Sequence, residues 1–410
     1  MTSSDQQMNS ISYMEPKLYK AAEAGNINPF KDRLPTSLIE LLTPQKNTIL
    51  HVYFENQRRG WKSTDFVGQI IDMCPQLLLQ ANTKGDTPLH FAARYGRSNA
   101  VKVLIKCAKA RPTDPESGVT EAKKMLRMTN EEQDTALHEA ARHRRSNVEQ
   151  QNHVELCLMV DKEKGQSVED SQGIQEVFNN WRFKRHEENR KKVIDEILSN
   201  CESLEYCGSH GRTALHAAAM HGDHETARKI LKKNASLTRR TDDDGWSPLH
   251  YAAFFSKFYD VSTVRVLLEY DVSAAYIVDS EKRTALHLAV VRGNSAAMKE
   301  IMNTCPTCCE LVDSRGWNAL HYAAITLKRA LAAMYFPRLI PKFDILIYEK
   351  DNDGNTPLHL FAAFGSYSQK FLSSDCRHAY KKMCGLNKQN LSVDDILVGN
   401  FPEEKVIPSI

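Results

Sequence analysis

The chain has 410 residues, of which 41% are hydrophobic, so it can bury one long core or two or three ordinary ones. Its 54 basic and 51 acidic residues nearly balance, which gives no electrostatic indication of a nucleic-acid partner. Ten cysteines are too few for a disulfide scaffold, and no apolar run predicts a secretory signal or an integral membrane segment. These features favour a cytoplasmic protein.

Residues 1–14 are polar and are expected to be flexible. A tetrapeptide of the type TPLH then recurs along the chain, at intervals of 34 to 48 residues with one longer interval of 78. The long interval predicts a degenerate copy near 175–205, and the same offsets predict a first unit at Pro16 and an unfinished one at Ser392. We therefore expect ten units and a C-terminal stub between residues 15 and 400, followed by a tail at 401–410. The first residues of the clear copies are Thr48, Thr87, Thr135, Thr213, Ser247, Thr284, Asn318 and Thr356.

Each copy has the chemistry of a short helix with defined ends. Thr or Ser is a preferred N-cap, and Pro at the next position has no N–H to lose. The Leu and Ala residues that follow give a narrow helix, and a glycine nine positions after the first residue can end it in the left-handed conformation. A second apolar helix follows, so the pattern predicts an all-α solenoid of helix–turn–helix units. The glycines are Gly96, Gly222, Gly293 and Gly365.

Two segments interrupt this period and are interpreted as insertions. The segment 109–130 contains Pro112, Pro115 and Gly118, which are poor residues for a helix interior. The segment 161–180 is polar, with two glycines and no apolar period. Both are expected to form exposed loops that leave the array.

TPLHFAA, TALHAAA and TALHLAV match the ankyrin-repeat signature, and the chain is identified as a member of that family over most of its length. The resemblance implies an all-α ankyrin-repeat solenoid with short β-hairpin fingers, and protein partners bound on its concave face and finger tips. Ankyrin arrays are typical binding modules, so no enzyme activity is expected.

A narrower resemblance is carried by LYKAAEAGNINPF, LLLQANTKGDTPLHFAARYG and KKMLRMTNEEQDTALHEAAR, which are similar to plant ankyrin proteins of the accelerated-cell-death type. That resemblance implies a regulator in plant defence and cell-death signalling, with salicylate-linked immunity as its setting. The resemblance further implies membrane-bound ankyrin relatives as candidate partners, and a location in the cytoplasm or peripherally at the cytoplasmic face of the plasma membrane. Such proteins continue into transmembrane helices, which are absent up to Ile410. The alternative is the cytosolic part of a channel-like or transport protein.

Eight histidines occupy the fourth position of the tetrapeptide, which suggests either a metal or proton-relay array or a structural role. The repeat favours the structural role, in which each imidazole hydrogen-bonds the backbone between adjacent hairpins. The clearest signature pairs are Thr87 with His90, Thr213 with His216, Thr284 with His287, and Thr356 with His359.

Two other groups of residues have chemical potential. Cys305, Cys308 and Cys309 suggest zinc, but Cys305 has equivalents in other repeats and a fourth ligand is missing. No metal and no cofactor are therefore expected. The segment 181–192 is basic and aromatic, yet two glutamates interrupt it, so nucleic acid is not expected as a partner and contact with anionic lipid stays open.

The partner surface is predicted from the residues before each tetrapeptide and at the end of the first helix. These positions place large apolar and basic side chains on neighbouring repeats, which are residue types that dominate binding energy. The alternative for the tryptophans is that both fold back onto their own hairpins. The candidate residues are Arg212, Trp246, Phe254, Phe255, Arg283 and Trp317.

Overall fold

The computed structural model describes residues 14–56, 64–112, 119–142, 188–201, 203–204, 206–256, 260–326, 346–364 and 384–399. The chain divides into two compact units, Met1–Ser209 and His210–Ile410, which are described separately. Within the described residues both units are helical, and two isolated antiparallel bridges, Thr129 to Thr135 and Val278 to Thr284, stand in place of strands. The predicted all-α repeat fold is therefore confirmed, with fingers that are tight turns.

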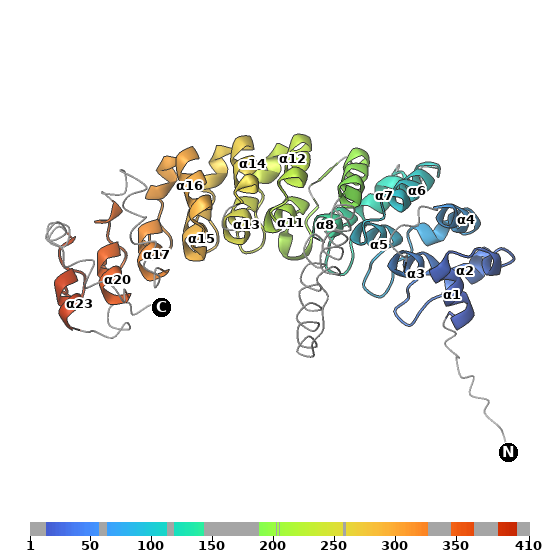
Figure 1. Cartoon of the computed structure of the whole chain (residues 1–410), viewed down its shortest axis with the longest axis horizontal. Coiled ribbons are helices and arrows are strands. Elements are labelled where there is room, and N and C mark those ends of the chain that lie inside the picture. Colours follow the sequence, from blue (N-terminus) through green and yellow to red (C-terminus); the bar gives the residue numbers. More distant parts are fainter. Residues whose placement is uncertain are drawn as a thin grey trace, which may run out of the picture. The chain divides into compact units, whose positions relative to one another are not determined.

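The first unit contains two rows of helices (Figure 1). In one row α1 contacts α3, α3 contacts α5, and α5 contacts α8; in the other, α4 contacts α6 and α6 contacts α7. The helices of the first row begin at the predicted signature positions, and we call them inner helices. The elements are α1 (Pro16–Ala24), η1 (Asn28–Phe30), α2 (Pro35–Glu40), α3 (Ile49–Asn56), α4 (Asp65–Met73), η2 (Pro75–Leu78), α5 (Pro88–Arg94), α6 (Ser98–Lys109), α7 (Glu121–Arg127), α8 (Ala136–Arg142) and a helix over 188–200.

The second unit repeats this arrangement with regular neighbours. Its inner helices α11, α13, α15, α17, α20 and α23 contact one another in sequence, and α12, α14 and α16 form the outer row (Figure 1). The elements are η4 (Ser209–Gly211), α11 (Ala214–Met220), α12 (His224–Lys233), η5 (Ala235–Arg239), α13 (Pro248–Phe255), α14 (Ser262–Tyr270), η6 (Val272–Tyr276), α15 (Ala285–Arg292), α16 (Ser295–Thr304), η7 (Pro306–Glu310), α17 (Ala319–Thr326), α20 (Pro357–Phe364) and α23 (Val393–Gly399).

One repeat shows why the sequence folds this way. Thr284 has an extended backbone, with φ of −88° and ψ of 168°, and begins α15. Leu286 and Ala289 are buried on this helix, and Gly293 ends it with a φ of 71°, a left-handed conformation that glycine adopts without steric cost. Asn294 then accepts a hydrogen bond from the N–H of Ala297 and begins α16.

The turn before an inner helix, which we call the finger, is in most described repeats held by one acidic or amide side chain. In the finger 242–246, Asp242 Oδ1 accepts hydrogen bonds from the N–H groups of Asp244 (3.1 Å) and Trp246 (2.7 Å). This residue lies five positions before the tetrapeptide, and a short polar side chain there satisfies backbone donors of the turn. Equivalent acceptors are Asn82, Asn130, Asp279, Asp313, Asp351 and Asn387.

Successive fingers are also joined by backbone hydrogen bonds. The N–H of Ser280 donates to the carbonyl of Asp244 (3.0 Å), and the N–H of Ser314 donates to the carbonyl of Glu281 (2.9 Å). In the first unit the N–H of Glu131 donates to the carbonyl of Lys84 (2.8 Å). These hydrogen bonds thus fix the position of each finger relative to the next one.

The signature histidines connect neighbouring repeats through both ring nitrogens. His216 Nδ1 accepts a hydrogen bond from the N–H of Thr213 (3.0 Å), and its Nε2 lies 3.0 Å from the carbonyl oxygen of Trp246 in the next finger. Because a carbonyl only accepts, Nε2 carries the proton and the ring is neutral. The same bridge is made by His51, His90, His250, His287 and His321.

These contacts confirm the structural interpretation of the histidines. Burial lowers the pKa of His216 and of His287 to about 4, and a proton added at Nδ1 would face a backbone N–H. At the last signature pair, Thr356 donates its N–H to His359 Nδ1 (3.1 Å), and burial lowers the pKa of His359 to about 4.

Of the two predicted insertions, the structure describes most of 109–130 and none of 161–180. The expectation of a loop throughout 109–130 is wrong, because α7 lies inside it and packs against α6. Thr120 caps α7 by accepting from the N–H of Lys123, and Met125 and Leu126 are buried, so a capped apolar helix forms despite the prolines before it. The segment 161–180 lies outside the described residues, as do 1–13, 400–410 and residues 180–183, where the tetrapeptide of the degenerate copy is expected. The later part of that copy is described as the helix at 188–200, in which Val193 and Ile197 are buried.

The neutral histidines predict a pH dependence of stability. A depressed pKa means that the folded protein binds fewer protons than the unfolded chain, so stability is complete above pH 6.5 and is lost as the pH falls toward 4. Within this window, each such histidine lowers the free energy of unfolding by at most about 1.4 kcal/mol for every pH unit that the pH falls. Urea unfolding between pH 7.5 and 5 should show this loss of stability. In the His216→Gln variant the free energy of unfolding should depend less steeply on pH. A free energy of unfolding that stays constant over this range would contradict the bridge.

Candidate protein-binding surface

Five inner helices of the second unit, α11, α13, α15, α17 and α20, each present one partly exposed apolar residue at the same position. This position is seven residues after the start of the tetrapeptide, at the end of the helix, and the side chain of Val291 there is 38% exposed. Since these helices contact one another in sequence, the residues line up across neighbouring repeats. We call this set the apolar stripe; its members are Met220, Phe254, Val291, Ile325 and Ala363.

An aromatic cluster widens the stripe at α13. The ring of Trp246 lies 5.6 Å from that of Phe254 and 5.2 Å from that of Tyr251, in edge-to-face arrangements. Phe255 stacks on Tyr251 at 5.9 Å, and Phe254 and Phe255 lie 4.9 Å apart. Trp246, Phe254 and Phe255 are half-buried, so the structure brings these three predicted residues together at the surface.

The fourth predicted aromatic residue, Trp317, does not belong to this surface. Its side chain is 1% exposed, and its Nε1–H donates to Asp351 Oδ2 (2.9 Å) in the next finger. The guanidinium of Arg315 covers the ring, with Cζ 4.0 Å from the ring centroid. The expectation that Trp317 projects toward a partner is therefore wrong, because a carboxylate on the next repeat gives its indole N–H a buried partner.

Of the two predicted arginines, Arg283 is engaged within its own finger. Arg283 is only 23% exposed and pairs with Asp279 (2.8 Å) and Glu281 (3.1 Å). Arg212 is half-buried and lies near Tyr251. The ion pairs of Arg283 make it part of the finger, and partial burial limits what either arginine can offer to a partner.

Sequence reasoning missed Arg292, which lies next to the stripe at the end of α15. Its Cζ is 5.5 Å from the ring centroid of Phe254, and it has no ion pair with any residue in the described part of the chain. Aligning the repeats would have identified Arg292 as a candidate, because it occupies the same repeat position as Phe255. Arg292 places one uncompensated positive charge beside the aromatic cluster.

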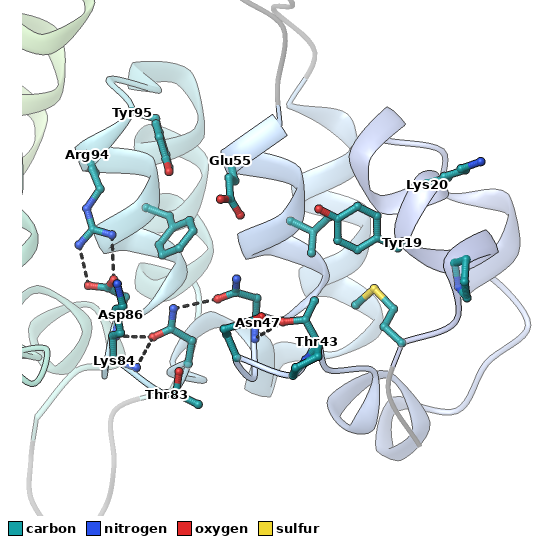
Figure 2. A pocket seen from close by; sticks show the side chains of 17 residues that line it. Tyr19, Lys20, Thr43, Asn47, Glu55, Thr83, Lys84, Asp86, Arg94 and Tyr95 are labelled. Atoms are coloured by element: carbon teal, nitrogen blue, oxygen red, sulfur yellow. Dashed lines mark hydrogen bonds and ion pairs between the residues drawn. The ribbon is translucent and has the colours of Figure 1, made fainter. Parts of the chain in front are cut away.

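In the first unit the stripe position carries charged residues. There, Arg94 pairs with Asp86 through two hydrogen bonds (2.8 and 2.9 Å) and with Glu139 (2.8 Å). Although burial opposes it, the hydrogen bonds from Arg94 hold the pKa of Asp86 below its usual value. Beside this network lies a groove of about 670 Å³, shown in Figure 2, which is lined by α1, α3, α5 and their fingers. The two units thus offer different chemistry on equivalent helices.

The other sequence candidates lie apart from both surfaces. Cys305, Cys308 and Cys309 are buried where α16 passes into η7, and hydrogen bonding to Cys309 together with burial raises the pKa of the Cys308 thiol. Across the ranges that the structure describes, no three His, Cys, Asp or Glu side chains gather in a way that could hold a metal ion. Most of 181–192 lies outside those ranges, and its Arg190 is buried and hydrogen-bonds the carbonyl of Ala140.

None of the helices in the described part of the chain is both long and apolar enough to span a bilayer.

Paired helices, bridged by a capping histidine and ordered by stacked fingers, define the class as a helical repeat protein. A sequence profile described as "Ankyrin repeats (3 copies)" matches residues 61–159, 186–275 and 255–336, which is more than half of the chain. The chain therefore belongs to the ankyrin-repeat family. Arrays of this kind are protein-interaction scaffolds.

Three similar proteins each match a part of this chain. Inversin of Gallus gallus is 34% identical over 106 residues, which are 26% of this chain and 9% of inversin. The nuclear factor NF-kappa-B p105 subunit of Gallus gallus is 26% identical over 193 residues, covering 43% of this chain and 19% of that protein. The target of rapamycin complex 2 subunit AVO2 of Saccharomyces cerevisiae is 25% identical over 158 residues, covering 38% and 35%. The chain spans about a third or less of these relatives.

The two tryptophans should respond differently to truncation. Trp317→Ala removes a fully buried indole and takes away the hydrogen bond to Asp351 Oδ2, so it should lower the free energy of unfolding by about 3–5 kcal/mol. Trp246→Ala removes a half-buried ring and should cost clearly less. Denaturant unfolding of both variants measures the difference, and equal losses would contradict these placements.

Proposed function

We propose that this chain is a non-catalytic scaffold that binds another protein along the apolar stripe of its second unit. The observation that supports this most strongly is the recurrence of apolar side chains at one partly exposed position on consecutive inner helices, from Met220 to Ala363. A contiguous exposed apolar surface is a common mark of a protein-interaction site. The equivalent positions in the first unit are Glu55, Arg94 and Arg142, so the repeat itself does not require an apolar residue there.

The same surface indicates what a partner would carry. Trp246, Phe254 and Phe255 form its widest apolar area, and clustered aromatic residues are enriched in binding hot spots. Arg292 beside them favours an acidic residue on the partner. We therefore propose a partner segment with large apolar side chains and an acidic residue at its edge.

The biological setting that we propose is plant defence and cell-death signalling. Support comes from the segments LYKAAEAGNINPF and LLLQANTKGDTPLHFAARYG, which are similar to plant ankyrin proteins of the accelerated-cell-death type. Membrane-bound ankyrin relatives are the partners that this resemblance suggests. A cytoplasmic location, or a peripheral one at the plasma membrane, is part of the same proposal.

Peptide binding tests the surface directly. Peptides selected from a random 16-residue library on the full chain should include apolar binders whose affinity falls at least about 30-fold in Phe254→Asp, because a hot-spot residue contributes about 2 kcal/mol or more. Val272→Asp is the matched control, since Val272 is an exposed apolar residue (45%) in η6 of the same unit. If both variants bound these peptides like the unmodified chain, the binding surface would lie elsewhere.

Expression in leaf tissue tests the setting. The unmodified chain should change the extent of pathogen-triggered cell death, and Phe254→Asp at equal protein level should not, because it loses the partner. An effect of the same size from both chains would separate the stripe from this signalling role, and the absence of any effect would contradict the setting.

A further inference from the structure

The groove of the first unit differs from the stripe in its chemistry as well as its place. Its volume of about 670 Å³ is that of a ligand-binding cleft, large enough for several residues of an extended peptide. One wall is helical and aromatic, with Tyr19 from α1 and Phe91 and Tyr95 from α5 and its end. The opposite wall consists of finger residues with amide and hydroxyl groups, including Thr43, Gln45, Asn47 and Thr83.

Glu55 is the acidic residue at the centre of the helical wall. Figure 2 shows it on the middle helix α3, between Tyr19 on one side and Tyr95 on the other. Tyr19 is held in place because its hydroxyl accepts a hydrogen bond from Asn56 Nδ2 (3.2 Å). Burial and the nearby charge of Glu55 raise the pKa of Tyr95, which is consistent with their closeness. Glu55 is exposed and has no hydrogen bond or ion pair within the described part of the chain.

The remaining charges of the groove leave Glu55 as its available anion. Asp86 is 1% exposed and fully engaged by Arg94, whose own charge is offset by Asp86 and Glu139. Lys20 points away from the groove and Lys84 lies at the finger (Figure 2). These two lysines disfavour a ligand with several positive charges, but a ligand with a single positive charge can be placed between the two tyrosines.

We infer that this groove binds an extended segment of another protein through a single lysine or arginine side chain, seated on Glu55 between Tyr19 and Tyr95. The carboxylate supplies a charge-assisted hydrogen bond to the cation. The faces of the tyrosine rings supply cation–π attraction, and the finger amides at Gln45 and Asn47 are suited to pair with the backbone of the segment. This binding is independent of the stripe, which lies in the other unit.

The test uses the full chain and four pools of fluorescent 12-residue peptides. The central residue is fixed as Lys, Arg, Gln or Glu in each pool, and the other positions are randomised without further charge. Fluorescence polarisation should show the Lys and Arg pools binding at least about 10-fold more tightly than the Gln pool, with the Glu pool weakest. The Glu55→Gln variant should lose this preference, and Tyr95→Leu should reduce it more than Tyr95→Phe.

Two controls keep the result specific. Glu131→Gln removes an exposed carboxylate from a finger of the same unit but outside the groove, and should retain the preference. Phe254→Asp alters the stripe and should retain it as well, so that failure of one surface is distinguishable from failure of the other. The inference is overturned if the four pools bind alike, or if the preference for Lys and Arg persists in a folded Glu55→Gln chain.

Discussion

A neutral imidazole, hydrogen-bonded at both ring nitrogens, joins one repeat to the next. In the second unit, His216, His250 and His287 each accept from the N–H that begins their own inner helix and donate to the carbonyl of the following finger. The ring can do both only in one neutral tautomer, with the proton on Nε2. Since the finger also receives a backbone hydrogen bond from its successor, this contact sets the spacing of the inner helices, and with it the alignment of every residue that faces a partner.

The sequence was most informative where the determinants are local. The Thr or Ser cap, the buried Leu and the glycine at the end of the helix lie within one repeat, so their pattern predicted the inner helices and the role of the histidines. Trp317 was misplaced because its partner Asp351 belongs to the next finger, and no pattern inside one repeat shows that contact. The finger acceptors such as Asp242 were visible five positions before each tetrapeptide and could have been found by aligning the repeats. The groove required three helices and their fingers together, which only the structure provides.

One frame therefore supports two surfaces of different character. The stripe position holds Phe254 and Val291 in the second unit, but Glu55 and Arg94 in the first. Because the caps and histidines maintain the helices, this position is free to vary without loss of the fold. Ankyrin arrays offer such variable positions on a constant scaffold, and this chain uses them for an apolar surface and for a charged aromatic groove.

The state of the bridging imidazoles is the central claim, and nitrogen NMR of histidine side chains measures it most directly. In a chain labelled with ¹⁵N-histidine, His216, His287 and His321 should show the neutral form protonated at Nε2 at pH 7, and should keep it to pH 5, because burial lowers the pKa of each to about 4. Assignment by single His→Gln variants identifies each signal. Titration of these rings near pH 6.5, or protonation at Nδ1 in the neutral form, would contradict the account.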